Sequence, residues 1–210
     1  MTGIESLGTF IIAAIIVVIT PGIDTIMVLT RSISLGKKAG LYSALGVSLG
    51  LIVHTLAATF GLSLILAQSA LAFSIVKYLG AAYLFYLGYK SLTAKTTQTE
   101  IKSIEVKNTK NRKLFFTALL SDILNPKIAI FFLAFLPQFV KSSEINNPAP
   151  YLLLGFIIFI ITLIWCSFLA LMRSNVATLF NKNKNAESRL NKMTGIVFIL
   201  LGLKVAFTKR

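Results

Sequence analysis

The sequence predicts an all-α, polytopic integral membrane protein with about six transmembrane helices, arranged as two inverted three-helix repeats. Three observations support this prediction. First, 56% of the 210 residues are hydrophobic and only 13% are charged, and a soluble domain of this length could not bury so much apolar surface. Second, the apolar residues form six stretches that approach the ~20 residues needed to cross a bilayer. Third, each half of the chain opens with a segment that a proline interrupts.

The six apolar stretches comprise residues 7–30, 39–66, 70–92, 114–140, 151–172 and 193–208. The first is expected to be a retained membrane helix and not a signal peptide. Residues 1–6 carry no Lys or Arg, and the apolar run is longer than a signal-peptide core. The last stretch is the weakest, because it is short and contains Lys204. Five or seven spans therefore remain alternatives to six.

The basic residues are distributed unevenly along the chain. A net charge of +14 would by itself suggest a nucleic-acid partner, but most Lys and Arg residues fall in the three connections that would share one side of a membrane, the first of which holds Arg31, Lys37 and Lys38. The other side would hold Lys141, Lys204, Lys209 and Arg210. Because positive residues collect in cytoplasmic loops, we expect both termini to lie outside the cytoplasm. The lipid bilayer is an expected partner, and nucleic acid is not.

One long polar stretch, residues 93–113, separates the two halves of the chain. It is rich in Thr, Lys, Asn and Gln, and it predicts a cytoplasmic linker whose basic residues meet anionic lipid headgroups. The linker joins repeat one, residues 7–92, to repeat two, residues 114–208, within a single membrane transporter domain, residues 1–210. Three spans per repeat place the second copy upside down, and inverted repeats with interrupted helices are typical of transporters.

Both interruptions have the same chemical pattern. The first reads Thr20-Pro21-Gly22-Ile23-Asp24, and the second reads Asn125-Pro126-Lys127. Proline is tolerated at the first residue of a helix, and Thr and Asn are good residues for the N-cap before it. Each pattern therefore predicts that one helix ends and a half-helix begins near mid-membrane, where its unpaired N–H groups favour an anion. A plain proline kink without a ligand is the structural alternative.

Charged residues inside apolar segments are costly and indicate function. Asp24 lies one turn after Pro21, Asp122 lies one turn before Pro126, and Lys127 follows that proline directly. We hypothesise that an amino acid or a similar zwitterion binds here. Its carboxylate would meet the half-helix ends and Lys127, and its ammonium group would meet Asp24 or Asp122. The alternative is a structural ion pair between Lys127 and one aspartate.

His54 completes the set of candidate residues. An imidazole can relay protons near neutral pH, although a hydrogen-bonded core histidine is the more common arrangement. The glycine pairs Gly36/Gly40 and Gly46/Gly50 have the spacing of close helix contacts. The candidate substrate and translocation residues are Thr20, Pro21, Gly22, Asp24, His54, Asp122, Asn125, Pro126 and Lys127.

Several classes of activity find no support in the sequence. It contains no Walker-type phosphate loop, no cluster of metal-ligating residues and no Ser-His-Asp arrangement, so we expect no enzyme, no cofactor and no metal. Transport would then need an existing gradient. Three rivals stay open, namely a passive channel, an integral-membrane enzyme and a non-transporting scaffold. A channel would normally show charged pore rings, and a scaffold would tolerate loss of the buried charges.

A series of motifs extends over nearly the whole chain apart from the linker. It comprises residues 20–24, Arg31-Ser32, Gly36, Ala39-Gly40, Gly46, Gly50, His54, residues 77–84, Gly88, Asn125-Pro126-Lys127, Phe131-Phe132 and residues 136–139. Together these motifs resemble the LysE/RhtB family of bacterial amino-acid exporters, of the lysine exporter or homoserine–threonine resistance type. The family more often has a second proline where Ile23 stands, and a glycine where Ala118 is the nearest counterpart.

The resemblance implies export of amino acids or close relatives across the bacterial plasma (inner) membrane. Proton coupling is consistent with it, and Asp24, Asp122 or His54 could carry the proton. A homo-oligomer is also compatible with the resemblance. Asp122 is less clearly a family position, so its role depends on the physical argument alone. The sequence does not distinguish among amino-acid substrates, because these differ in their contacts with only a few side chains of the binding site.

Overall fold

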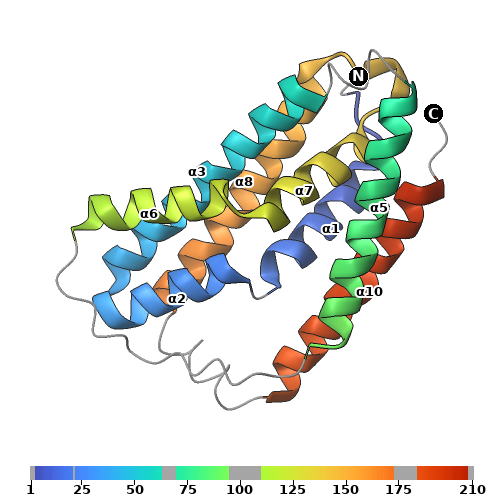
Figure 1. Ribbon diagram of the computed structural model, residues 1–210. Coiled ribbons are helices and arrows are strands. Elements are labelled where there is room, and N and C mark those ends of the chain that lie inside the picture. The colour runs from blue at the N-terminus through green and yellow to red at the C-terminus, as the bar shows by residue number, and fades with distance from the viewer. Residues whose placement is uncertain (1–2, 21, 63–69, 95–109, 173–183, 208–210) are drawn as a thin grey trace.

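The structure is a computed structural model that describes residues 3–20, 22–62, 70–94, 110–172 and 184–207 (Figure 1). The described part contains no β-strand beyond an isolated bridge between Ile4 and Val140, so the all-α prediction is confirmed. The α-helices are α1 (Leu7–Ile19), α2 (Ile23–Leu35), α3 (Lys37–Ala57), α5 (Ala70–Leu92), α6 (Asn111–Ile123), α7 (Pro126–Phe135), α8 (Pro148–Leu171) and α10 (Lys184–Phe207).

Short helical turns connect or extend these helices. A π-helix, η1 (Ala58–Leu62), continues α3, and the 3₁₀ turns η2 (Leu136–Phe139) and η3 (Ser142–Glu144) lead from α7 to α8. The start of α8 follows from its sequence. The Asn147 side chain accepts a hydrogen bond from the Ala149 N–H at 3.0 Å, and Pro148 stands at the first position, where its missing N–H leaves no bond unmade.

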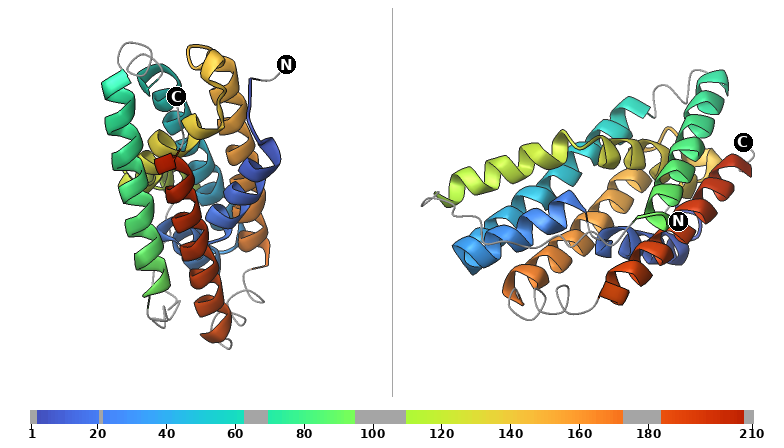
Figure 2. Two further views of the ribbon diagram at one scale, coloured as in Figure 1. Left: turned by 90° about the vertical axis from the view of Figure 1, so that its right-hand side faces the viewer. Right: turned by 60° about the horizontal axis from the view of Figure 1, so that its bottom comes forward.

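The order of helices is the same in both halves of the chain. A broken pair, α1–α2 or α6–α7, is followed by two longer helices, α3 and α5 or α8 and α10. Helices α3 and α8 pack together, and α5 packs against α10 along its length (Figure 2). Both of these pairs are antiparallel. In the first pair Gly40 approaches Ala170 while Thr55 approaches Gly155, and in the second Gly88 approaches Gly195 while Ala81 approaches Gly202.

Two described helices are long and apolar enough to cross a membrane. They are α3 with its continuation, Lys37–Gly61, and α8, Pro148–Leu171; the pair α1–α2, bent by 51° at its break, would be a third. The prediction of a multi-pass helical membrane protein is therefore supported, while the number of six spans and the inverted repeats stay predictions. Of the six predicted stretches, residues 70–92 coincide with α5.

Several predicted boundaries differ from the observed helices. Helix α10 begins at Lys184 and not near residue 193, α6 begins at Asn111 within the predicted linker, and α3 begins at Lys37. Apolar residues mark the part of a helix that meets lipid or core, whereas the hydrogen-bonded backbone continues into polar turns that face water. Residues 95–109 of the predicted linker lie outside the described part of the chain.

Glycines let α3 approach its neighbours closely. A Cβ added at Gly46 would meet the backbone of α6 at Phe115 and the Ala118 side chain, and one at Gly40 would meet Ser32 of α2 and Ala170 of α8. The predicted close packing at these glycines is confirmed. Gly36 serves differently, because it adopts φ 96° at the corner between α2 and α3, a conformation that favours glycine.

Candidate functional site

The first break lies between α1 and α2. Thr20 ends α1, since its N–H and its Oγ1 both donate to the Ile16 carbonyl, at 3.2 and 2.7 Å. Helix α2 then begins after Gly22, which is its N-cap and offers no side chain. The prediction that Thr20 caps α2 is therefore wrong. Its hydroxyl is already used in closing α1 and in a buried hydrogen bond with the Thr194 hydroxyl of α10. Pro21 lies outside the described residues.

The second break follows the predicted pattern more closely. Helix α6 ends at Ile123, and Pro126 is the first residue of α7. Asn125 directly precedes it in the N-cap position, and its carbonyl accepts from the Ile128 and Ala129 N–H groups, each at 3.1 Å. The Asn125 N–H in turn donates to the Asp122 carbonyl at 2.9 Å. The chain thus passes from α6 to α7 without leaving these backbone groups unbonded.

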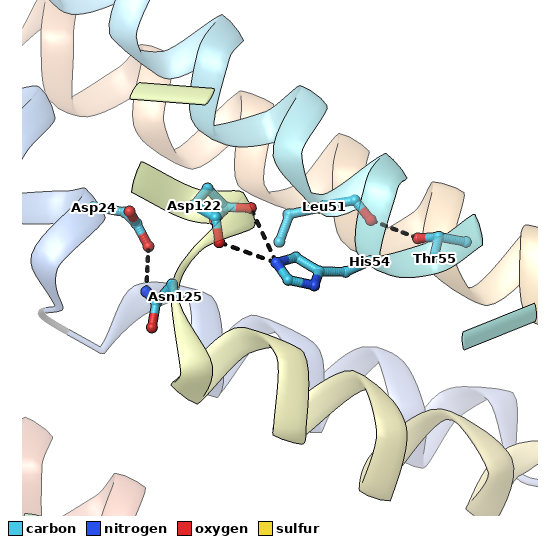
Figure 3. A network of polar contacts seen from close by, with 6 residues as sticks. All are labelled: Asp24, Leu51, His54, Thr55, Asp122 and Asn125. Atoms are coloured by element: carbon cyan, nitrogen blue, oxygen red, sulfur yellow. Dashed lines mark hydrogen bonds and ion pairs between the residues drawn. The ribbon is translucent and has the colours of Figure 1, made fainter. Parts of the chain in front are cut away.

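The two breaks meet through one side-chain contact. Asp24 lies in the first turn of α2, where a negative charge is favoured by the helix dipole. Its Oδ2 accepts from Nδ2 of the buried Asn125 at 3.4 Å (Figure 3). These residues are 101 positions apart in the chain. Two interrupted helices from opposite halves of the chain therefore bring their polar residues to one place.

His54 extends this cluster from α3. Its Nε2 lies 3.0 Å from the Asp122 carbonyl oxygen and 3.8 Å from Oδ2 of the same residue (Figure 3). Because a carbonyl oxygen only accepts, the shorter contact requires a proton on Nε2. The ring also packs 5.8 Å from the ring of Phe132 in α7. The prediction of a hydrogen-bonded core histidine is confirmed, and its role in proton transfer stays a prediction.

Asp122 is the most deeply buried acidic residue of the cluster. It is 0% exposed, and neither carboxyl oxygen has a hydrogen-bond partner within the described residues. The space for this side chain is made by Gly50 of α3, because an added Cβ there would meet the Asp122 carboxyl group. A buried carboxyl group with one histidine beside it and no hydrogen bond is expensive to maintain, which points to a role beyond folding.

Lys127 is placed only in part. It is the second residue of α7, in the turn that follows Asn125, and its side chain lies outside the described residues. Both predictions for it, contact with a substrate carboxylate and a structural ion pair with an aspartate, therefore stay predictions.

Arg31 is a polar residue near the site that the sequence placed in a connecting loop. It lies within α2, and its guanidinium donates to Ser43 Oγ at 3.1 Å, to the Leu114 carbonyl at 2.8 Å and to Thr117 Oγ1 at 2.9 Å. It thereby joins α2 to α3 and to α6. The signal available in the sequence was the Arg31-Ser32 motif, which lies two turns after Asp24 on the same helix.

Comparisons with known proteins agree on one family. A family model described as LysE type translocator matches residues 15–209. An uncharacterized membrane protein of Bacillus subtilis, YrhP, is 34% identical over 97% of this chain and 100% of its own length. A protein of Salmonella typhimurium named leucine efflux protein is 29% identical over 97% of this chain and 96% of its own length. No solved structure matches the chain.

Proposed function

The chain belongs to the LysE type translocator family, and we propose that it exports amino acids or closely related small solutes from the cytoplasm across the plasma membrane. The family match and the relatives named for leucine efflux point to a transporter and not to an enzyme. Leucine is the first substrate to test, because those relatives cover nearly the whole chain. The export would be driven by an existing gradient.

The contact between Asp24 and Asn125 carries the proposal for the central site. The start of α2 offers backbone N–H groups that favour a carboxylate, and Gly22 at its N-cap leaves the approach free of a side chain. The substrate ammonium group would pair with Asp24 or Asp122, while Lys127 would attract the carboxylate. Thr20, Pro21 and Pro126 shape the two breaks. A zwitterion would fit such a site better than a simple ion would, because the proposal gives the site charges of both signs.

His54 and Asp122 give the proposed site a means of coupling. The imidazole Nε2 lies 3.8 Å from the buried carboxyl group, so a small movement would bring the two within hydrogen-bond distance and let a proton pass between them. Loss or gain of that proton would change the charge beside Asp24, and hence the affinity for the ammonium group. This arrangement supports export driven by protons, whereas a passive channel would not need it.

The proposed topology has six spans, with both termini outside the cytoplasm. The antiparallel pairs α3–α8 and α5–α10 support two inverted repeats, residues 7–92 and 114–208, because each pair joins corresponding helices of the two halves. The starts of α3 and α6 carry exposed basic residues, Lys37, Lys38, Arg112 and Lys113. These turns would face the cytoplasm.

Cysteine labelling tests this orientation. Cys166 is buried, so it should not react, and single cysteines can be introduced at Ser142 and at Lys38, which are both exposed. We expect a membrane-impermeant maleimide to label Ser142→Cys in intact cells and Lys38→Cys only after permeabilisation. The reverse pattern would require the opposite orientation.

Efflux from preloaded cells tests the proposed function. Cells loaded with labelled leucine and other amino acids would carry wild type, Asp24→Asn or Lys127→Ala at matched expression. We expect wild type to accelerate export of a subset, and each variant to fall to about a tenth of that rate or less, because a charge that holds the zwitterion is lost. Glu5→Gln, at an exposed position, is the control. Normal export by both variants would make these charges structural.

A further inference from the structure

The positively charged Arg31 side chain contacts only uncharged groups within the described residues. All three hydrogen bonds go to neutral acceptors, two hydroxyl groups and a carbonyl. Within the described residues the half-buried guanidinium has no carboxylate partner. A fixed positive charge held by neutral groups alone is better placed to receive an anion than to stabilise the fold.

The guanidinium also keeps donors for such an anion. Arginine has five N–H donors, and the contacts in the described structure use two on Nη1 and one on Nη2. The Nε hydrogen and the second Nη2 hydrogen are left. The planar fork matches a carboxylate through two parallel hydrogen bonds, and charge-assisted bonds are roughly twice as strong as neutral ones. A substrate carboxylate would therefore compete well for this group.

Arg31 lies on the same helix as Asp24, which belongs to the proposed central site. It follows Asp24 by seven residues on α2, which is about 10 Å along the helix and nearly the same face. Its contacts on α6 lie on the helix that carries Asp122. The neighbouring first turns of α3 and α6 are basic and contain no acidic residue. Such a positive field raises the local concentration of anions.

We propose that Arg31 is a cytoplasmic subsite, which binds the carboxylate of an amino acid before the molecule reaches Asp24 and Asn125. This inference rests on the proposed export function and adds a second binding position to it. The substrate would bind the two guanidinium donors that are left, while the contacts to the neutral acceptors keep α2 tied to α3 and α6. The subsite should prefer amino acids over their amides, because an amide lacks the negative charge.

Competition in reconstituted vesicles tests the subsite. Purified wild type, Arg31→Gln, Arg31→Lys and the control Arg189→Gln, at an exposed position of α10, would be placed in phosphatidylcholine vesicles, and counterflow of labelled L-leucine measured against unlabelled L-leucine or L-leucinamide. For Arg31→Gln we expect the inhibition constant of leucine to rise about tenfold, the effect of losing one charge-assisted contact. The constant for leucinamide should stay unchanged. Arg31→Lys should restore much of the leucine affinity, since it keeps the charge.

The outcomes separate a binding role from a structural one. Equal losses for leucine and leucinamide, or a lysine variant as defective as the glutamine variant, would make Arg31 only a tie between helices and overturn the subsite. An effect that appears only when phosphatidylglycerol is added would assign the anion to a lipid headgroup, and would overturn it too. If wild-type vesicles move no leucine, the leucine export proposal and the subsite both fail. The outcomes above, in which wild type still moves leucine, overturn the subsite alone.

Discussion

Replacing Asp122 by asparagine is expected to abolish export while leaving the protein at least as stable as wild type. The carboxyl group is fully buried and makes no hydrogen bond within the described residues. A charge in a membrane segment costs about 2.5–3.5 kcal/mol, and asparagine has the same shape without the charge. Folding is therefore not weakened, whereas the carboxyl group that we propose carries a proton beside His54 is lost. Export should fall to about a tenth of the wild-type rate or less.

Two measurements on the same purified protein check this prediction. Leucine efflux reports the function, and thermal unfolding in detergent reports the stability. Glu5→Gln, which neutralises an exposed carboxylate, should match wild type in both. If Asp122→Asn unfolds at a much lower temperature and its export falls in proportion to the folded fraction, the carboxylate is a structural element and not a carrier of protons.

Replacing Gly50 by alanine is expected to cause a large loss of stability. The new Cβ would occupy the space of the Asp122 carboxyl group. That side chain is held between α3 and α6, which pack closely along their lengths. Overpacking of this kind costs about 1–3 kcal/mol. We also expect export to fail, because the carboxyl group would be displaced from His54.

Matched glycines and a double variant give this prediction its controls. Gly61 and Gly8 have nothing within 4 Å of an added Cβ, so Gly61→Ala and Gly8→Ala should unfold like wild type. The double variant Gly50→Ala with Asp122→Ala should recover most of the lost stability, because the smaller side chain vacates the contested space. A double variant no more stable than Gly50→Ala would show that the strain lies in the backbone of α6.

The sequence was informative where a single residue type forces the backbone. Pro126 predicted the start of α7 correctly, because proline lacks the N–H that a helix interior needs. An interruption at residues 20–22 was predicted for the same reason. The glycine spacing along α3 likewise predicted close packing at Gly40 and Gly46. These features depend on local chemistry, and therefore one sequence is enough to find them.

The features that the sequence did not yield depend on distant partners. Thr20 has the composition of an N-cap, but its hydroxyl bonds back to α1 and to Thr194, which is 174 positions away. Arg31 was placed in a loop, although its acceptors on α3 and α6 hold it within α2. The fit of Asp122 against Gly50 is a property of two packed helices. No local pattern encodes which residues meet across such a contact.

The register of α5 against α10 has a consequence for the origin of the chain. Gly88 packs on Gly195, and Gly202 packs beside Ala81. If the segment around Gly80 and Gly88 corresponds to the segment around Gly195 and Gly202, a two-fold rotation relates the two contacts, as in an isologous dimer. Half of this chain, inserted in both orientations, would present the same surface twice and pair with itself. The contact between α5 and α10 would then descend from a subunit boundary that gene fusion made permanent.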